Sequence, residues 1–484
     1  MSAPPLDRRT YRILHGSLPL EVLRFGVPLG LGMGLQTAFN LVDAYIIARL
    51  PSDVAGPALG AIGICDQVAA LGTIISYGIS VAAASMVSRA WGRGDKDEAR
   101  RIAWQSGLLV LGLGIVLALV GGLGARTLLT HVIGVKGQVA ERGADYLSVV
   151  MGGGVTMFLM LHCASLLRAV GSAKTPVFLL VLGNVINFFF AVVFVYGPGA
   201  APEYMAWGPA TARALGVPRL ELFGACVATV LARAVVLLPL AFFAAKRLGF
   251  VSRATALVPD RAVIAQVLRL AWPSSAELVV RMCAMLLTHA LVARAFTTAT
   301  NQSATTALGI VFRFETMALF ISIGWGSAVQ TFVGQNMGAA QLLRAKQSGY
   351  WAALYNTVMM ALLSVIYVAF APSIVGFFDR DPQVLAIAQS YFAWVAPTYV
   401  ALGIGIVLGS VMQGAGVPER ALLLDGCVLL AVQVPASAWV FFSSSRSLTH
   451  VWLVAGVSYV ALAITLLVSY RRGRFLGPLG PTLA

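Results

Sequence analysis

Long apolar stretches dominate the chain, and short breaks that contain glycine, proline or arginine separate them. A helix of about 20 residues, rising ~1.5 Å per residue, crosses the hydrocarbon core of a bilayer. Most of the stretches reach this length, so the pattern predicts membrane-spanning helices rather than strands. The twelve predicted spans lie at residues 20–49, 57–87, 101–124, 142–168, 176–197, 221–245, 265–294, 303–333, 348–371, 384–412, 419–442 and 450–470.

Composition supports an all-α polytopic membrane protein. Of the 484 residues, 59% are hydrophobic and only 11% are charged, whereas soluble domains carry roughly 25% charged residues. The net charge of +15 does not indicate nucleic-acid binding, because the basic residues lie at the ends of the apolar stretches rather than in one cluster with aromatic residues. The five cysteines are isolated, so neither a disulfide framework nor a metal site is expected. Phosphate-loop and zinc-hydrolase motifs are missing from the sequence, and we expect no enzymatic activity.

The distribution of lysine and arginine predicts an orientation. An even number of spans places both termini on the same side of the membrane, and most basic residues outside the spans fall on that side. Basic residues are enriched in cytoplasmic loops. We therefore expect a multi-pass membrane protein with both termini in the cytoplasm. We expect no signal peptide, because the first residues lack a clear apolar core and a cleavage site.

The two halves of the chain repeat short motifs in the same order. LRFGVP at residues 23–28 returns as LRLAWP at 268–273, and VSRAWGRGDKDEAR at 87–100 returns as VGQNMGAAQLLRAK at 333–346. Six predicted spans separate each motif from its copy, so the repeats run in parallel about an axis along the membrane normal. The predicted organisation is a cytoplasmic tail at 1–18, an N-lobe at 19–246, a cytoplasmic linker at 247–262, a C-lobe at 263–470 and a cytoplasmic tail at 471–484.

Asp43 is the most informative polar residue of the first predicted span. An ionised side chain at this depth costs a few kcal/mol or more, and membrane-embedded acids normally face a protein interior or a water-filled cavity. A carboxyl group held away from water can bind a proton near neutral pH. Two interpretations remain open, a buried structural hydrogen bond and an ion- or proton-binding site. Pro28 weakens the hydrogen-bond ladder of the same helix, and the glycines near it either make the helix pliable or allow close helix packing.

Several motifs, in order and with fitting spacing, resemble those of the multidrug and toxic compound extrusion (MATE) transporters, in particular the bacterial proton-coupled, DinF-like branch. The resemblance covers residues 20 to 470. It implies twelve helices in two six-helix lobes around a V-shaped central cavity, and efflux of organic, often cationic and amphiphilic molecules driven by a proton or sodium gradient. The motifs are NLVDAYIIARL (40–50), SRAWGRGDKDEARR (88–101), RAVGSAKTP (168–176), NVINFFFAVVFVYG (184–197), GACVAT (224–229), FVGQNMGAAQLLRAK (332–346) and MQGAGVPER (412–420).

The resemblance also assigns residues to an amino-terminal coupling site. Asp43 matches the first-helix acid of the family, Asn187 the fifth-helix asparagine and Thr229 the sixth-helix threonine. Asn184 lies one turn from Asn187 and either extends this network or packs between helices. Many relatives have an aspartate four residues after that asparagine, where this chain has Ala191. With one fewer carboxylate, tight sodium binding is harder to explain, whereas a proton needs only Asp43. No cofactor other than the coupling ion is expected.

Charged residues of the second half offer two interpretations. Glu277 and Arg281 are spaced i,i+4 and can pair on one helix face, while Arg313 and Glu315 lie in the pattern FRFET. These four residues form either a structural ion-pair network or a site for substrate or ion, since unpaired charges are costly in the membrane.

Two further acids lie within predicted spans, one about a third of the way into the second span and one early in the eleventh. Asp66, in the second span, is a weaker candidate for substrate contact. Asp425 is expected at the cytoplasmic rim, solvated or paired with Arg420.

The sequence therefore predicts a proton-coupled (or sodium-coupled) antiporter of small organic, cationic and amphiphilic molecules that acts as a monomer in the lipid bilayer. One rival is a flippase for a lipid-linked precursor, in which Arg281 and Arg313 would hold phosphates. The other rival is a non-transporting membrane enzyme or receptor, which leaves the internal repeat unexplained. The sequence does not identify the substrate.

Overall fold

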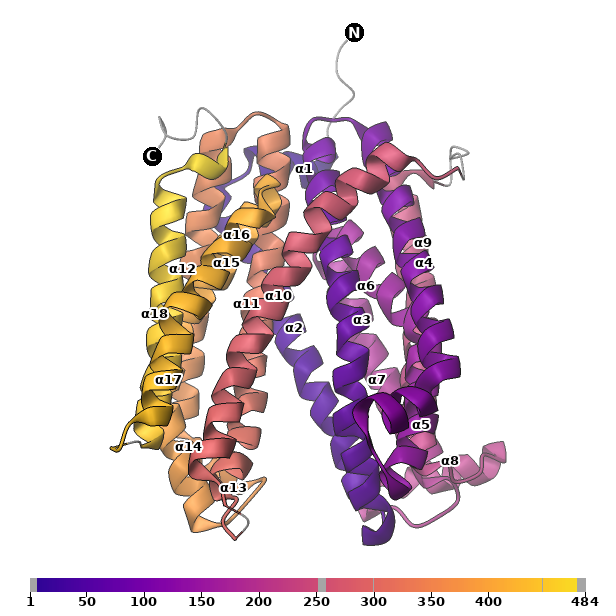
Figure 1. The fold of residues 1–484 in the computed structure, drawn as a ribbon. Helices are drawn as coiled ribbons and strands as arrows, with labels where there is room; N and C mark the ends of the chain where they lie inside the picture. The colour runs from indigo at the N-terminus through magenta and orange to yellow at the C-terminus, as the bar shows by residue number, and fades with distance from the viewer. Residues whose placement is uncertain (1–6, 251–257, 299, 446, 477–484) are drawn as a thin grey trace. The chain divides into compact units, whose positions relative to one another are not determined.

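The computed structural model describes residues 7–250, 258–298, 300–445 and 447–476, and every regular element in these residues is a helix (Figure 1). Short 3-10 and π segments (η) interrupt or join the α-helices. The elements of the first half are α1 (Arg8–His15), α2 (Leu18–Ala48), α3 (Ser52–Gly92), α4 (Lys96–Thr127), η1 (Leu128–Ile133), α5 (Gly137–Gly152), α6 (Gly154–Ala169), α7 (Lys174–Tyr196), η2 (Glu203–Met205), α8 (Trp207–Leu215) and α9 (Glu221–Leu248). Those of the second half are α10 (Arg261–Phe296), α11 (Ser303–Gly338), α12 (Leu342–Ala369), α13 (Ala371–Gly376), α14 (Pro382–Val395), η4 (Ala396–Thr398), α15 (Tyr399–Ala415), α16 (Pro418–Val428), η5 (Leu429–Gln433), α17 (Val434–Phe442), α18 (Leu448–Arg471) and η6 (Arg474–Leu476).

The helical class and the predicted spans are confirmed. Within the described residues, 11 segments are long and apolar enough to cross a membrane, and a twelfth results if one bent pair counts as a single span. That pair is α5 and α6, which replace the predicted continuous span 142–168 and meet at an angle of 42°. The break falls at Gly153, where a Cβ atom would lie 2.4 Å from the side chain of Val230, so glycine permits the close approach of α9.

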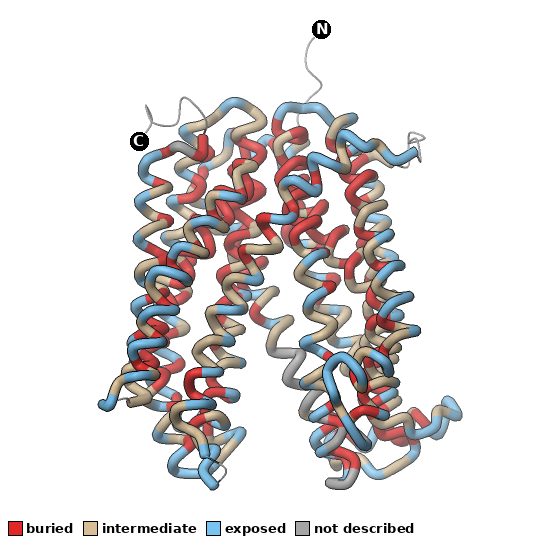
Figure 2. Tube along the Cα trace, in the orientation of Figure 1, coloured by how far each residue is buried: buried red, intermediate tan, exposed pale blue. Residues whose placement is uncertain are grey.

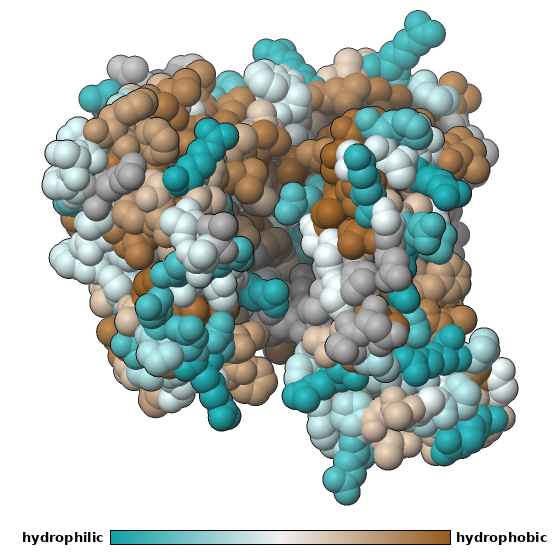
Figure 3. Space-filling view, turned by 60° about the horizontal axis from the view of Figure 1, so that its bottom comes forward, coloured by the Kyte–Doolittle hydropathy of each residue, from teal (hydrophilic) through white to brown (hydrophobic). Residues whose placement is uncertain are grey.

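Apolar side chains cover much of the outer surface. Figure 3 shows hydrophobic residues over large parts of the visible face, interspersed with hydrophilic ones. On α4, Leu123 is 86% exposed and Val120 is 64% exposed. Lipid tails solvate exposed apolar side chains, whereas soluble proteins rarely expose them in large patches, so the exposed side chains of α4 agree with a membrane location.

The chain divides into two compact units. Unit 1 contains residues 1–34, 84–95 and 272–484, and unit 2 contains residues 35–83 and 96–271. The first part of α2 and the last part of α3 therefore belong with the second half of the chain, although the sequence repeat assigns them to the N-lobe.

Unit 1 is organised around α11 and α15, which pack extensively on each other. Most of their residues are buried, as the red segments of Figure 2 show. The amino-terminal part of α2 packs closely on α11, because a Cβ atom on Gly26 would lie 2.1 Å from the indole of Trp325. Gly30 faces the same indole and Gly34 faces Ile321. These three glycines thus serve close packing, one of the two functions predicted for them.

Helix α1 was not predicted, and it is anchored to unit 1 at both ends. The indole nitrogen of Trp91 donates a hydrogen bond of 2.8 Å to the hydroxyl of Thr10. The guanidinium of Arg344 donates to the carbonyl oxygens of Ile13 (3.1 Å) and Gly16 (2.6 Å), which are free at the end of this helix. The tail before the first span is therefore partly structured.

The repeated motif forms matching turns in unit 1. After α3 the chain turns at Gly94 with φ of 82°, and after α11 it turns at Ala340 with φ of 58°. These positions correspond in the two copies of the motif. The ends of the two helices also cross with matching contacts, because a Cβ on Gly92 would lie 2.0 Å from the carbonyl oxygen of Gln335 and one on Gly338 would lie 2.1 Å from that of Arg89. The geometry agrees with the predicted duplication.

Unit 2 is a bundle in which α9 packs on α5, α6 and α7. A buried histidine joins three of its helices: His162 of α6 lies 3.2 Å from Ser80 of α3 through Nδ1 and 3.2 Å from Ser106 of α4 through Nε2. Because both ring nitrogens are bonded to serine hydroxyls, His162 has a structural role, as its lone position in an apolar stretch indicates. The bundle holds α7 and α9 side by side, and these helices carry most of the predicted coupling residues.

Candidate functional site

Unit 2 contains a pocket that brings together all four residues predicted for the coupling site. Its empty volume is about 500 Å³, including the part that is open to solvent. Asp43 comes from α2, Asn184 and Asn187 from α7, and Thr229 from α9. The remaining lining residues are Gln36, Met160, Leu180, Gly183, Ala232 and Arg233.

Asn187 holds the carboxylate of Asp43. Its Nδ2 atom donates to Oδ1 of Asp43 at 2.8 Å and to Oδ2 at 3.0 Å. Asn184 precedes Asn187 by three residues, so the helical repeat brings both amides to the same side of α7. Two buried amide atoms in this pocket, Oδ1 of Asn187 and Nδ2 of Asn184, have no hydrogen-bond partner among the residues that the structure describes. Buried polar atoms of this kind normally bind water or a ligand.

Thr229 and Arg233 lie one turn apart on α9 and face the same pocket. The hydroxyl of Thr229 donates to the carbonyl oxygen of Ala225 at 2.9 Å, so its lone pairs remain available. Arg233 interacts electrostatically with Asp43 and Asp66 but forms no direct ion pair with either of these described residues. Sequence reasoning missed Arg233, although its i,i+4 spacing from Thr229 was a usable signal.

Asp66 does not line this pocket. Its carboxylate is exposed and accepts a hydrogen bond of 3.0 Å from the hydroxyl of Tyr146 on α5. Its role in substrate contact therefore stays a prediction. Pro28 lies within α2, which is continuous from Leu18 to Ala48, and its role in bending the helix also stays a prediction.

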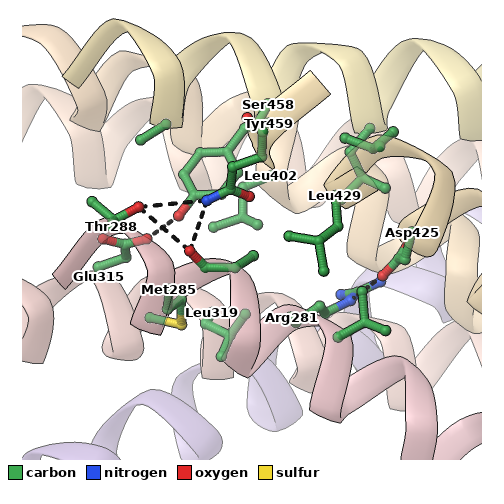
Figure 4. A pocket seen from close by; sticks show the side chains of 16 residues that line it. Arg281, Met285, Thr288, Glu315, Leu319, Leu402, Asp425, Leu429, Ser458 and Tyr459 are labelled. Carbon is green, nitrogen blue, oxygen red and sulfur yellow. Dashed lines mark hydrogen bonds and ion pairs between the residues drawn. The ribbon is translucent and has the colours of Figure 1, made fainter. Parts of the chain in front are cut away.

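A second pocket lies in unit 1, with an empty volume of about 630 Å³ including its open part. Figure 4 shows Glu315 and Tyr459 at one end, Arg281 and Asp425 at the other, and leucine side chains between them. The π-helix η5 brings Gln433 into this pocket, where its amide donates to the carbonyl oxygen of Ala284 at 2.7 Å. Polar groups at both ends and an apolar middle are typical of small-molecule sites.

Arg281 is enclosed by two buried carboxylates. Its guanidinium donates to Glu277 at 2.7 Å, as the i,i+4 spacing predicts, and to Asp425 of α16 at 2.6 Å. Gln413 of α15 donates to the other oxygen of Glu277 at 2.9 Å. The prediction for Asp425 was wrong: it is only 4% exposed and pairs with Arg281 rather than Arg420. Packing of α16 on α15 and α18 buries this part of the helix.

Glu315 and Arg313 do not join that network. The carboxylate of Glu315 accepts hydrogen bonds from the phenol groups of Tyr391 and Tyr459, which replace a cationic partner. Arg313 is exposed and lies outside the lining of the pocket. Two residues along the helix turn by about 200°, so Arg313 and Glu315 point to opposite sides. The predicted four-residue network is therefore smaller, with Arg281 as its only described arginine.

No group of three or more histidine, cysteine, aspartate or glutamate side chains in the described residues is arranged to hold a metal ion. The two pockets instead present isolated or paired carboxylates inside bundles of apolar helices. Together with 11 to 12 candidate spans, this arrangement defines a polytopic, all-helical membrane protein with buried ionisable sites. Such residues in membrane spans are typical of transporters.

The chain belongs to the MatE family. The family model matches residues 28–193 and 278–439, one segment in each half. Among the curated relatives, the chain is 25% identical over 431 residues to a protein of Shewanella oneidensis named FAD transporter, covering 88% of this chain and 89% of the relative. It is 21% identical over 468 residues to the probable multidrug resistance protein YpnP of Bacillus subtilis, covering 96% and 98%.

Solved structures show the same fold. The structure titled "Outward-facing conformation of a multidrug resistance MATE family transporter of the MOP superfamily" superposes with a TM-score of 0.83 at 21% sequence identity, covering 97% of this chain and 98% of that chain. The match supports the twelve-helix architecture that the sequence predicts.

Proposed function

We propose that this chain is a proton-coupled exporter of small organic molecules, with Asp43 as the group that binds and releases the proton. The observation that supports this proposal is the Asp43 pocket, in which one amide donates to both carboxylate oxygens and two further amide atoms lack a hydrogen-bond partner within the described part of the chain. When Asp43 takes up a proton, its bonds from the Asn187 amide weaken, because the protonated oxygen becomes an O–H donor and the carboxyl group loses its negative charge. Protonation thus changes the contact between α2 and α7.

The same proposal includes the finer expectations from the sequence. The substrates are organic, cationic and amphiphilic, and they bind between the lobes. The protein acts as a monomer in a bacterial inner membrane with both termini in the cytoplasm. Family membership and the name of the Bacillus relative support multidrug efflux, and the basic residues support the orientation.

The test is transport by the purified full-length chain in proteoliposomes. A proton gradient and a sodium gradient are imposed separately, with ethidium as cargo. We expect the proton gradient to drive ethidium flux in the wild type, and Asp43→Asn to reduce this flux to the level of empty liposomes while the protein stays folded. Asp145→Asn, which changes an exposed acid of α5 outside the lining of the pocket, is the matched control and is expected to retain flux. Normal proton-driven flux by Asp43→Asn would refute the assigned role.

A second candidate cargo follows from the Shewanella relative, whose name is FAD transporter. Flavin adenine dinucleotide is therefore included as a second cargo in the same liposomes. Flux of this dinucleotide without ethidium flux would replace the cationic substrate class and keep the transporter assignment.

The flippase alternative loses its main argument. Arg281 would have to bind the phosphates of a lipid-linked precursor, but it already pairs with Glu277 and Asp425. Its charge is more than balanced by the two carboxylates, so this part of the pocket does not attract anions.

A further inference from the structure

We propose that Arg233 determines the cation selectivity of the Asp43 pocket, in that it excludes sodium and other metal ions and leaves the proton as the coupling ion. This inference rests on the proposed function, since it takes Asp43 as the coupling group. Arg233 belongs to none of the sequence motifs, but it lines the pocket together with Asp43.

The charges in the pocket support this assignment. Of the described lining residues, Asp43 is the only acid and Arg233 is the only base. An arginine cannot be deprotonated in a protein, so it contributes a permanent positive charge. With Asp43 ionised, the lining residues have no net charge. A metal ion would add a second cation next to a fixed one in a poorly solvated site, where the repulsion is strong.

A neighbouring acid lies outside the lining of the pocket but interacts electrostatically with both Asp43 and Arg233. Asp66 interacts electrostatically with Arg233, as does the phenol of Tyr146. The carboxylate of Asp66 lies outside the lining and accepts its hydrogen bond from Tyr146 on α5. Arg233 therefore interacts with both acids while it occupies the pocket of only one.

Hydrogen-bond donors surround the carboxylate of Asp43. Asn187 turns its Nδ2 atom toward both carboxylate oxygens, and its buried Oδ1 atom accepts no hydrogen bond from the residues described. The reversed amide would place an oxygen against two carboxylate oxygens, so chemistry fixes this orientation. A hard metal ion needs several oxygen ligands at once. Here the side chain of Asn187 turns an N–H group rather than its oxygen toward the carboxylate of Asp43, and the guanidinium of Arg233 can supply donors only.

A proton has neither requirement. It binds covalently to one oxygen of Asp43, needs no other ligand and occupies almost no volume. Protonation neutralises Asp43, so the positive charge of Arg233 is no longer balanced within the pocket. This unbalanced charge favours the later release of the proton. The same arginine thus excludes metal ions and keeps proton binding reversible.

The experiment compares Arg233→Gln with Arg233→Lys, which keeps the charge. Sodium binding to the purified full-length protein is measured by the rise in melting temperature with NaCl relative to choline chloride. We expect no sodium-specific rise in the wild type or in Arg233→Lys. In Arg233→Gln, loss of one nearby charge is expected to raise the sodium affinity by about tenfold or more. The double variant Asp43→Asn, Arg233→Gln is expected to lose this effect, which locates the ion at Asp43.

Two results would overturn the inference. One is a sodium-specific rise in the wild type that disappears in Asp43→Asn, a measurement that remains informative if Arg233→Gln does not fold. The other is a folded Arg233→Gln that responds to sodium no more than the wild type does. Either result leaves the proton-driven flux assay unaffected, so failure of this inference can be distinguished from failure of the proposed function.

Discussion

Buried carboxylates need neighbours that replace water, and this chain supplies three kinds of neighbour. Asp43 accepts from one amide group, Glu315 accepts from two phenols, and Glu277 shares the guanidinium of Arg281 with Asp425. Only the last arrangement contains a direct salt bridge. The difference matters, because a close cation favours the ionised form of a carboxylate more strongly than a neutral amide or phenol donor does.

Removal of Arg281 is expected to destabilise unit 1 strongly. In Arg281→Gln, two carboxylates that are each 4% exposed would lose their common partner, and breaking a buried pair in this way costs about 3–5 kcal/mol. The melting temperature of the purified protein measures the effect. Arg313→Gln is the control, since an exposed substitution is typically within about 0.5 kcal/mol of neutral. Equal effects of the two variants would show that the buried network contributes nothing to stability.

The repeated turn allows a test with one variant in each half. Ala340 has a left-handed φ of 58° and an exposed side chain, whereas its counterpart Gly94 has a φ of 82°. A side chain in this conformation costs about 1–2 kcal/mol, part of which the greater freedom of glycine in the unfolded chain offsets. We therefore expect Ala340→Gly to raise the melting temperature and Gly94→Ala to lower it. The space around Gly94 is open, so a steric clash would not confuse the comparison.

At the scale of elements, helix α2 has two different ends. Its first part carries glycines that fit against α11, and its last part carries Asp43 into the pocket of unit 2. The glycines of α2 therefore form a packing surface. Because glycine has a low helix propensity, they also make this part of the helix easier to bend.

Gly26→Ala is expected to destabilise the protein by about 1–3 kcal/mol, the usual cost of overpacking a tight contact. The added methyl group would lie 2.1 Å from the indole of Trp325. The melting temperature is compared with that of Gly107→Ala on α4, where the space around the Cβ position is open. The destabilisation caused by Gly26→Ala should be smaller in a Trp325→Leu background, because the smaller leucine leaves room for the added methyl group. An undiminished cost in that background would contradict the proposed contact.

The spans could be predicted from the sequence because a bilayer demands long apolar helices regardless of how they pack. The break at Gly153 could not, since it depends on Val230 of another helix. The same limit explains the errors at the sites. Asp43, Asn187 and Thr229 were found through their motifs, whereas Asp425 was misplaced and Arg233 was missed because hydropathy does not tell which side chain shares a pocket with which.

At the scale of the whole molecule, sequence duplication and spatial grouping differ. The repeat divides the chain near its middle, as do the two segments matched by the family model. The compact units divide the chain differently, because residues 1–34 and 84–95 group with the second half. Ser85 shows one reason: its hydroxyl donates to the carbonyl oxygens of Gln413 (2.7 Å) and Gly414 (3.2 Å) at the end of α15.

Because the units share the chain in this way, the polypeptide cannot be cut between them at a single loop. The chain passes between the units at Gly34, Ala83, Asp95 and Ala271, and three of these crossings fall inside the continuous helices α2, α3 and α10. A cut in the loop between α9 and α10 would therefore not yield two self-sufficient polypeptides. The later fragment would lack Ser85, Gly92 and the α2 surface that covers Trp325, and it would need the earlier fragment to be synthesised beside it.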